Sequence, residues 1–439
     1  MEQYTFNGTA RSVFLGLMAV GVLCLGLTWF NDVDEYHSRF WTNILHNGVF
    51  FVGIAIMATF FLAANITAYA GWYITFKRVL ESLTTYLLPG FIIMALVGIA
   101  VYMHMNHLYH WTDESILDSS DPEKYDKIIG GKSSFLNKNW YLFGTVIIGA
   151  SYIFLASKLR KLSLSEDEEG SANDFKVHRD IRKYAAIFLP IFGFTSVVLM
   201  WQWVMSVDAH WYSTMFAWYC LASLFISMIC SVILITLYLK SKGYLPNVGQ
   251  HHIHDLGKFL FGISVFWTYL WFSQFMLIWY ANVGEETIYF KERYDNYPAL
   301  FFGNLVINFV LPFLILMRND TKWKIGSLSF VAIIAFLGHW LDFFLMIKPG
   351  VLHTAHEVSG HHGGDGHSEA AGHAADDGGH MVEHVSTFVS GFTLPGLLEI
   401  GTMLGFVGLF GFVVFSALSK VKLTAQKDPY FEESVHHHV

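Results

Sequence analysis

The sequence predicts an all-α polytopic membrane protein of about ten transmembrane helices, arranged as two four-helix bundles plus two flanking helices. Its 439 residues are 54% hydrophobic and only 14% charged, a balance that soluble proteins rarely reach. Ten apolar runs reach about 18 residues or more, the length that crosses roughly 30 Å of hydrocarbon as a helix. Because backbone amides find no water in lipid, runs this long and continuous must be helical.

The predicted spans follow one another along the chain. They cover residues 11–30, 41–68, 82–104, 139–158, 184–206, 213–239, 256–280, 299–317, 327–347 and 389–418. The first run has only Arg11 nearby and no small-residue cleavage site before "NDVDEYH", so it is expected to be a retained span and not a signal peptide.

A weak similarity between spans two to five and spans six to nine suggests the domain division. Phe143 and Gly144 in span four match Phe302 and Gly303 in span eight. The alternative is that Phe, Gly and Trp recur by chance in an aromatic-rich membrane protein. The predicted domains are residues 1–39 (a flanking helix and outer loop), 40–208 and 209–349 (the two bundles), 350–387 (a His/Gly-rich outer loop) and 388–439 (the tenth helix and tail).

The distribution of basic residues predicts the orientation. Most of the 27 Lys and Arg residues fall in the loops on the same side as the two termini. By the positive-inside rule, both termini are expected in the cytoplasm and the chain in a bacterial inner membrane. The acidic and His-rich loops then face the periplasm.

Two features bear on metals. Residues 351–384 hold eight His among Gly, Ala and Asp; we expect a disordered spacer, with loose binding of a divalent metal as the alternative. The three cysteines, Cys24, Cys220 and Cys230, all fall in predicted spans, so no haem attachment or iron–sulfur ligand set is expected. Any redox metal must then belong to a partner.

Carboxylates and imidazoles gather where the predicted spans meet the outer face. Within a bilayer each costs roughly 2.5–3.5 kcal/mol on insertion scales, so each needs a reason. Those near the outer ends of odd-numbered spans are Asp32, Asp34, Glu35, His104, His107, His110, Asp208, His210, Glu285, Glu286, His339 and Asp342. Glu399 lies about three turns into the tenth span from this face. Few comparable groups are expected deep in the inner half.

Five of these residues are the candidate proton acceptors or relays: Asp208, His210, His339, Asp342 and Glu399. Asp208 has an alternative role as the N-cap of span six, with His210 a simple interfacial side chain. His339 and Asp342 are three residues apart and share a helix face, so the imidazole can hold the carboxylate's charge or proton inside the membrane. Glu399 follows the helix-disturbing "TLPG".

Oxidation of a quinol needs such groups at one membrane face, because two hydroxyl protons must leave with two electrons. The quinone ring also needs an apolar slot, and the aromatic segment 266–290 is one candidate lining, although an interfacial aromatic belt is the commoner reason for such residues. The candidates for a quinone pocket or polar path are Trp203, Trp211, Gln274 and Glu285.

Three segments, "MSVDAHWYST" (205–214), "WFSQFMLIWYANVGEETIYF" (271–290) and "TLPGLLEIG" (393–401), carry a resemblance to a known family. With them the chain resembles the NrfD-like integral subunits of bacterial alternative complex III, a quinol:electron acceptor oxidoreductase, which are similar to the polysulfide reductase membrane subunit. The resemblance covers essentially every span. Of the complex's two such subunits, this chain looks like the shorter, ActF-type one.

The resemblance implies a function and partners. It implies two four-helix bundles with two flanking helices, a menaquinone- or ubiquinone-type quinone as cofactor, and haem and iron–sulfur clusters in partner subunits. The implied partners are an ActC-like paralogue, an iron–sulfur subunit, multihaem cytochrome c subunits and a terminal oxidase, together with the lipid bilayer; no nucleic acid is expected. In the family, quinol oxidation is assigned chiefly to the ActC-type subunit, and the ActF-type subunit is thought to offer a related polar path for protons.

Other functions stay open at this point. A secondary transporter would use the same two-bundle repeat with a carboxylate at the membrane midplane. A structural anchor would hold peripheral subunits without a site of its own. An intrinsic b-type cytochrome is not expected, because it needs paired His on facing helices and only His339 is expected deep in a span.

Overall fold

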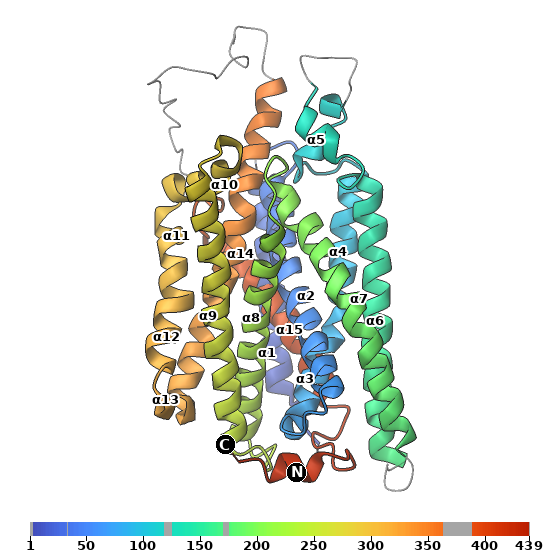
Figure 1. Cartoon of the computed structure of the whole chain (residues 1–439). Helices are drawn as coiled ribbons and strands as arrows, with labels where there is room; N and C mark the ends of the chain where they lie inside the picture. The colour runs from blue at the N-terminus through green and yellow to red at the C-terminus, as the bar shows by residue number, and fades with distance from the viewer. Residues whose placement is uncertain (1–2, 33, 118–124, 170–174, 363–388, 439) are drawn as a thin grey trace.

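The computed structural model describes residues 3–32, 34–117, 125–169, 175–362 and 389–438. Within these ranges ten helices are long and apolar enough to cross a membrane, and the only β pairing is an isolated bridge between Gln3 and Lys422. The predicted all-α polytopic fold is confirmed. The helices run along one axis, and both chain ends lie at the same end of the molecule (Figure 1). We call this the termini end and the opposite one the distal end.

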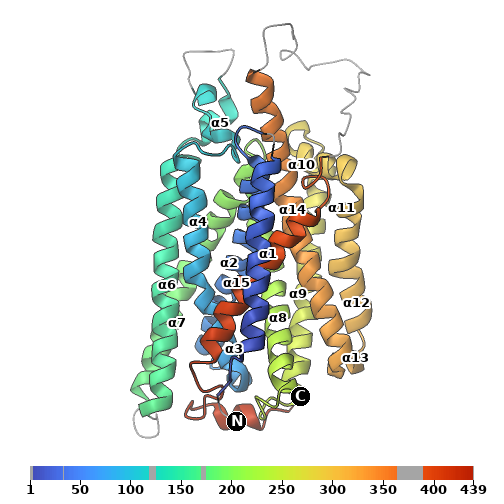
Figure 2. The same ribbon diagram turned by 180° about the vertical axis from the view of Figure 1, so that it is seen from behind.

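Helices α1 (Gly8–Asn31) and α15 (Leu397–Leu418) form a flanking pair that crosses along one side of the molecule (Figure 2). Gly21 and Gly405 meet at the crossing, and a Cβ on either would overlap the Cα of the other. Small residues are what allow two helices to approach this closely in lipid. The tenth span begins later than predicted, because residues 389–396 form turns.

A first group of helices surrounds α2 (Ser38–Thr67). It contains α3 (Lys77–Leu83), α4 (Leu87–Tyr102), α6 (Lys138–Glu169) and α7 (Lys176–Trp203). The α3 and α4 segments, joined by a 3-10 turn over Thr84–Tyr86, make up the third span. The short α5 (Lys127–Lys132) lies beyond this group at the distal end (Figure 1).

A second group packs around α8 (Thr214–Ser241) and α14 (Ile325–His362). It contains α9 (Gln250–Ala281) and a span made of α11 (Pro298–Leu305), a π-helical turn (Val306–Val310) and α12 (Leu311–Leu316). The short α10 (Gly284–Asn296) caps this group at the distal end, while α13 (Asn319–Trp323) and α16 (Phe431–Val435) lie at the termini end (Figure 1).

Charged residues are buried at the termini end, where the sequence analysis expected few. Lys77 and Arg78 belong to α3 and are 2% and 1% exposed, not part of a cytoplasmic loop. Lys77 Nζ donates to Asp428 Oδ2 at 2.7 Å, and Arg78 pairs with Glu81 and Asp167. The third span begins at Ile74 and not at the predicted residue 82, because counterions from α6 and the C-terminal tail allow the helix to start earlier with its charges enclosed.

Most of the predicted His-rich loop lies outside the described residues. Its first part, 351–362, continues helix α14.

Candidate functional site

Asp342 lies in α14, within a candidate membrane span, and the residue is fully buried at 0% exposure. Its carboxylate accepts four side-chain hydrogen bonds. Oδ1 accepts from Asn304 Nδ2 at 2.7 Å and from the Tyr219 hydroxyl. Oδ2 accepts from Ser223 Oγ and from Trp267 Nε1, both at 3.0 Å. The donors come from α8, α9 and α11, so three helices converge on one carboxylate and compensate for its removal from water.

His339 is one turn from Asp342 on the same helix and is also fully buried. Its Nδ1 lies 3.9 Å from Asp342 Oδ2 but only 2.8 Å from Ser223 Oγ. Since the Ser223 hydroxyl has one proton and gives it to Asp342, its oxygen must accept the Nδ1 proton of His339. Nε2 of His339 is then an acceptor, and it has no hydrogen-bond partner within the described part of the chain.

Local sequence places the remaining members of this network. Asn304 is the next-to-last residue of α11, directly before the π-helical turn, and it accepts a hydrogen bond from Asn308 Nδ2 at 2.5 Å. Gly338 lets this turn approach α14, because a Cβ there would overlap the Asn308 amide. π-helical turns inside α-helices occur frequently at functional sites.

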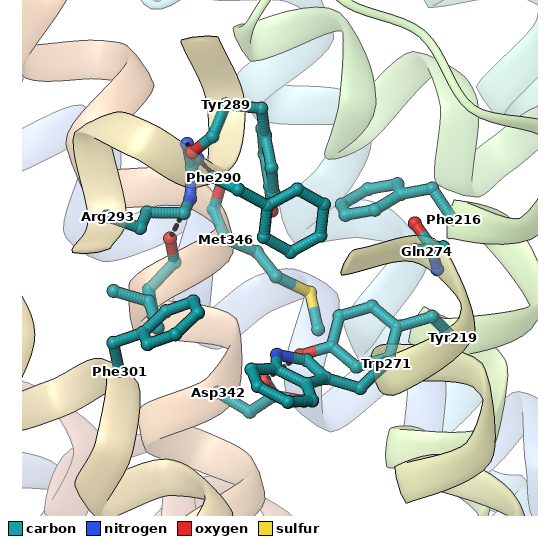
Figure 3. Close-up of a pocket in the computed structure, with 11 residues that line it drawn as sticks. Phe216, Tyr219, Trp271, Gln274, Tyr289, Phe290, Arg293, Phe301, Asp342 and Met346 are labelled. Carbon is teal, nitrogen blue, oxygen red and sulfur yellow. Dashed lines mark hydrogen bonds between the residues drawn. The ribbon is translucent and has the colours of Figure 1, made fainter. Parts of the chain in front are cut away.

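A small cavity lies against the Asp342 network toward α10. Its volume is about 20 Å³, and Asp342, Tyr219 and Gln274 supply polar lining (Figure 3). The remaining lining residues are Phe216, Trp271, Tyr289, Phe290, Arg293, Phe301, Leu345 and Met346. The predicted residue Gln274 is 4% exposed and accepts a weak hydrogen bond from Ser213 Oγ at 3.4 Å. The space is sufficient for about one ordered water.

Asp208 forms an ion pair with Arg293 on the α10 side of this cavity. Arg293 Nη2 donates to Asp208 Oδ2 at 2.8 Å and to the Met346 carbonyl at 3.1 Å. Burial opposes the charge of Arg293, but the nearby Tyr289 and Asp208 outweigh it and hold the pKa of Arg293 above its usual range. Gly350 of α14 leaves room for Asp208, since a Cβ would lie 2.8 Å from its Oδ1.

Trp211 lies against α10, next to the ion pair of Asp208 and Arg293. The Trp211 ring stacks on the Tyr289 ring, with the two centroids 4.1 Å apart. The Arg293 guanidinium carbon lies 3.5 Å from the centroid of the same Tyr289 ring. Burial raises the pKa of Tyr289 well above its usual range. The stack and the ion pair together fix the position of α10 over the cavity.

The structure does not bring the other predicted residues to this site. His210 is exposed, and its Nε2 lies 2.5 Å from Asp126 Oδ2 in the outer segment before α5. Trp203 is buried in the first group of helices, where its Nε1 donates to Thr145 Oγ1 at 2.9 Å. Glu285 is exposed at the start of α10.

Glu399 belongs to a second buried polar cluster, formed by α2, α14 and α15. Arg39 binds its carboxylate through Nε at 2.8 Å and Nη2 at 3.0 Å, and Asn43 Nδ2 donates to it at 3.2 Å. Lys348, which is 0% exposed, donates to Asn43 Oδ1 at 2.6 Å. Gly391, at a φ of +87°, lies against the Arg39–Glu399 pair, where a side chain would collide with it.

Several residues of these two clusters and of their surroundings were not predicted from the sequence. They are Tyr219, Ser223, Trp267, Asn304, Arg293, Arg39, Lys348 and His46. His46 is 1% exposed, so His339 is not the only imidazole buried in a span; its Nε2 lies 2.9 Å from the Trp340 carbonyl oxygen. Lys348 directly follows the predicted span 327–347, and a lysine in that position is a signal from which its role could have been predicted.

Comparison of the sequence with models of known families gives no match, and comparison with curated proteins gives none either.

Proposed function

We propose that this chain is an integral membrane subunit of a respiratory quinol:electron acceptor oxidoreductase of the alternative complex III type, and that its second group of helices conducts protons through Asp342. The observation that carries the proposal is the connection of Asp342 to His339 through Ser223, beside a cavity of about 20 Å³. An ionisable pair enclosed within a span is expensive and is a functional site by default.

The geometry supports a stepwise transfer. Nε2 of His339 has a free lone pair and takes up a proton. The Nδ1 proton then passes to Ser223 Oγ, 2.8 Å away, as the Ser223 proton passes to Asp342 Oδ2 at 3.0 Å. A protonated Asp342 releases its proton to a water in the adjoining cavity. The two transfers through Ser223 each run along one hydrogen bond, and the imidazole returns to its neutral form with its remaining proton on Nε2.

The size of the cavity beside Asp342 argues for protons and against quinone at this site. Ligand pockets for drug-sized molecules occupy roughly 300–1,000 Å³. The cavity beside Asp342 has about 20 Å³, so a quinone ring does not fit it. In this proposal a paralogous subunit binds quinol, partner subunits carry the haem and iron–sulfur groups, and the distal end faces the periplasm.

A test uses the complex purified from its own membrane through a tag on this chain. Reconstituted in vesicles, it is supplied with a quinol, and the rate of quinol oxidation and the number of protons released per quinol are measured. Asp342→Asn is expected to lower the proton yield. The matched control is Asp295→Asn, an exposed carboxylate on α10. An unchanged rate and proton yield in Asp342→Asn, or a tagged chain that co-purifies with no redox subunit, would refute the proposal.

One observation favours a second function, that of a secondary transporter. A π-helical turn interrupts the α11–α12 span beside a buried carboxylate, and transporters place ion sites at such interrupted helices. Purification as a free monomer or homodimer, with uptake of a solute coupled to protons, would support this function. Co-purification with redox subunits and wild-type turnover in Asp342→Asn would instead indicate a structural anchor.

A further inference from the structure

A second cavity lies where the N-terminal segment meets the ends of α1 and α15, and its volume is about 640 Å³. Its lining residues are Gln3, Tyr4, Thr5, Phe6, Arg11, Phe412, Ser416, Ser419 and Lys420. Both helices are transmembrane candidates, and α1 starts and α15 ends at this place. The cavity therefore lies at the level where the hydrocarbon of a bilayer gives way to lipid headgroups.

The charge of the lining is purely positive. Arg11 and Lys420 are both exposed, no Asp or Glu lines the cavity, and no ion pair in the described residues includes either cation. The Arg11 guanidinium lies 5.8 Å from the ring centroids of both Phe6 and Phe412, which positions it at the edge of the apolar wall. Basic side chains at a membrane surface attract anionic lipid.

The polar part of the lining offers a further hydrogen-bond donor. Gln3 donates one amide hydrogen to the Ser419 carbonyl at 2.7 Å, which leaves its second amide hydrogen for a ligand. An anion with several oxygens suits this combination of two cations and a neutral donor.

An apolar surface continues from the cavity along α1. Only Gly21 and Thr28 are buried among the residues of this helix, and Val13, Leu15 and Val20 are exposed. We propose that the cavity binds the phosphate of an anionic phospholipid whose acyl chains lie along α1. The site requires a membrane but not the respiratory role proposed above, so the two proposals can fail separately.

The experiment is native mass spectrometry of the full chain, together with whatever subunits co-purify, in detergent. Phosphatidylglycerol, phosphatidylcholine with the same acyl chains, and inorganic phosphate are titrated separately. We expect one saturable phosphatidylglycerol adduct and weaker retention of phosphatidylcholine. Each of Arg11→Gln and Lys420→Gln is expected to weaken phosphatidylglycerol binding about fivefold, since a basic residue near the surface contributes about that factor.

The matched controls are Lys176→Gln and Lys183→Gln, exposed cations of α7 that line neither cavity. They should bind phosphatidylglycerol like the wild type, and Arg11→Lys should restore most of the binding. Equal loss in the α7 variants, or no loss in the cavity variants, would overturn the site. Displacement of phosphatidylglycerol by inorganic phosphate at millimolar concentration would assign it to free phosphate and overturn the lipid proposal.

Discussion

Ser223 on α8 and His339 on α14 are 116 positions apart in the chain, yet Ser223 Oγ lies 2.8 Å from His339 Nδ1. The same hydroxyl donates to Asp342 Oδ2 at 3.0 Å. Because the direct distance from His339 to Asp342 is 3.9 Å, the serine is the link between the two ionisable groups. The proposed proton path from His339 to Asp342 therefore depends on this single hydroxyl.

Replacing Ser223 with Ala should interrupt that path. Proton transfer through a positioned group contributes on the order of 10²–10⁴-fold, and a water can replace part of the lost hydroxyl, so we expect a loss of about tenfold or more in proton transfer. Stopped-flow measurement of proton release after a single quinol turnover gives the rate. Ser227→Ala is the control, because Ser227 Oγ only donates to the Ser223 carbonyl of its own helix. Equal rates in the two variants would exclude the serine from the path.

Arg293→Gln should destabilise the distal end of the second group of helices. The change leaves Asp208 without its ion pair and frees the Leu345 and Met346 carbonyls that Arg293 now satisfies. Breaking a buried pair costs roughly 3–5 kcal/mol. The melting temperature in detergent should fall by several degrees, whereas Arg318→Gln, whose pair with Asp320 is largely exposed, should leave it within about one degree. Comparable melting of both variants would contradict this prediction.

The C-terminal tail should detach in acid. Burial disfavours the charge of Asp428, but the Lys77 ammonium outweighs it and lowers the pKa of Asp428 below its usual range. Because the docked pKa is the lower one, the ion pair stabilises docking above the ordinary carboxyl pKa of about 3.9 and loses this effect as the pH falls through the depressed pKa. Hydrogen exchange of the tail should be unchanged from pH 7 to about pH 5, after correction for intrinsic rates, and should increase below about pH 4.

Asp428→Asn tests the same contact at neutral pH. It removes the counterion that lies 2.7 Å from Lys77 Nζ and leaves Glu166 at 3.8 Å as the nearest carboxylate. The tail amides should then exchange fast at pH 7, and acid should add little. Protection of these amides at pH 7 in the variant would show that apolar contacts hold the tail without the ion pair.

Gly21→Ala should weaken the flanking pair. The new methyl group would overlap the Gly405 backbone, which cannot move aside as a side chain can. Overpacking costs typically about 1–3 kcal/mol, so the melting temperature should fall. Gly16→Ala is the matched control on the same helix, since a Cβ there meets nothing within 4 Å. A fall of the same size in both variants would attribute the effect to the alanine itself.

The spans could be predicted because their signal is local. A helix that crosses a bilayer needs a long apolar run, and each of the ten runs corresponds to one helix of sufficient length. The ends were less well predicted. The third span begins at Ile74 and not at residue 82, because Lys77 and Arg78 are enclosed by counterions that are distant in the sequence. A hydropathy scale scores Lys and Arg as polar wherever they lie, so it places the start of the span after them.

The candidate site was predictable only where its members share a helix. The spacing of His339 and Asp342 placed them on one face of α14, and they lie 3.9 Å apart. The grouping of Asp208 with His210 rested on a spacing of two in an irregular turn, which fixes no direction. Asp208 contacts Arg293, whereas His210 contacts Asp126.

Arg293 was missed for a related physical reason. It belongs to the charged helix α10, whose composition resembles an exposed loop, and yet it is 2% exposed. Its burial depends on carbonyl groups of α14 and on the carboxylate of Asp208, none of which is near it in the sequence. Periodicity within a single helix contains no information about such partners.

The crossing of Gly21 with Gly405 joins two helices that are far apart in the sequence. Helix α1 is synthesised before the eight intervening spans, and α15, its main neighbour, is synthesised after them. The contact between α1 and α15 can therefore form only after the eight intervening spans have been synthesised. Packing of α1 against α15 is therefore a late step of assembly, and a chain that stops before residue 397 lacks the main neighbour of α1.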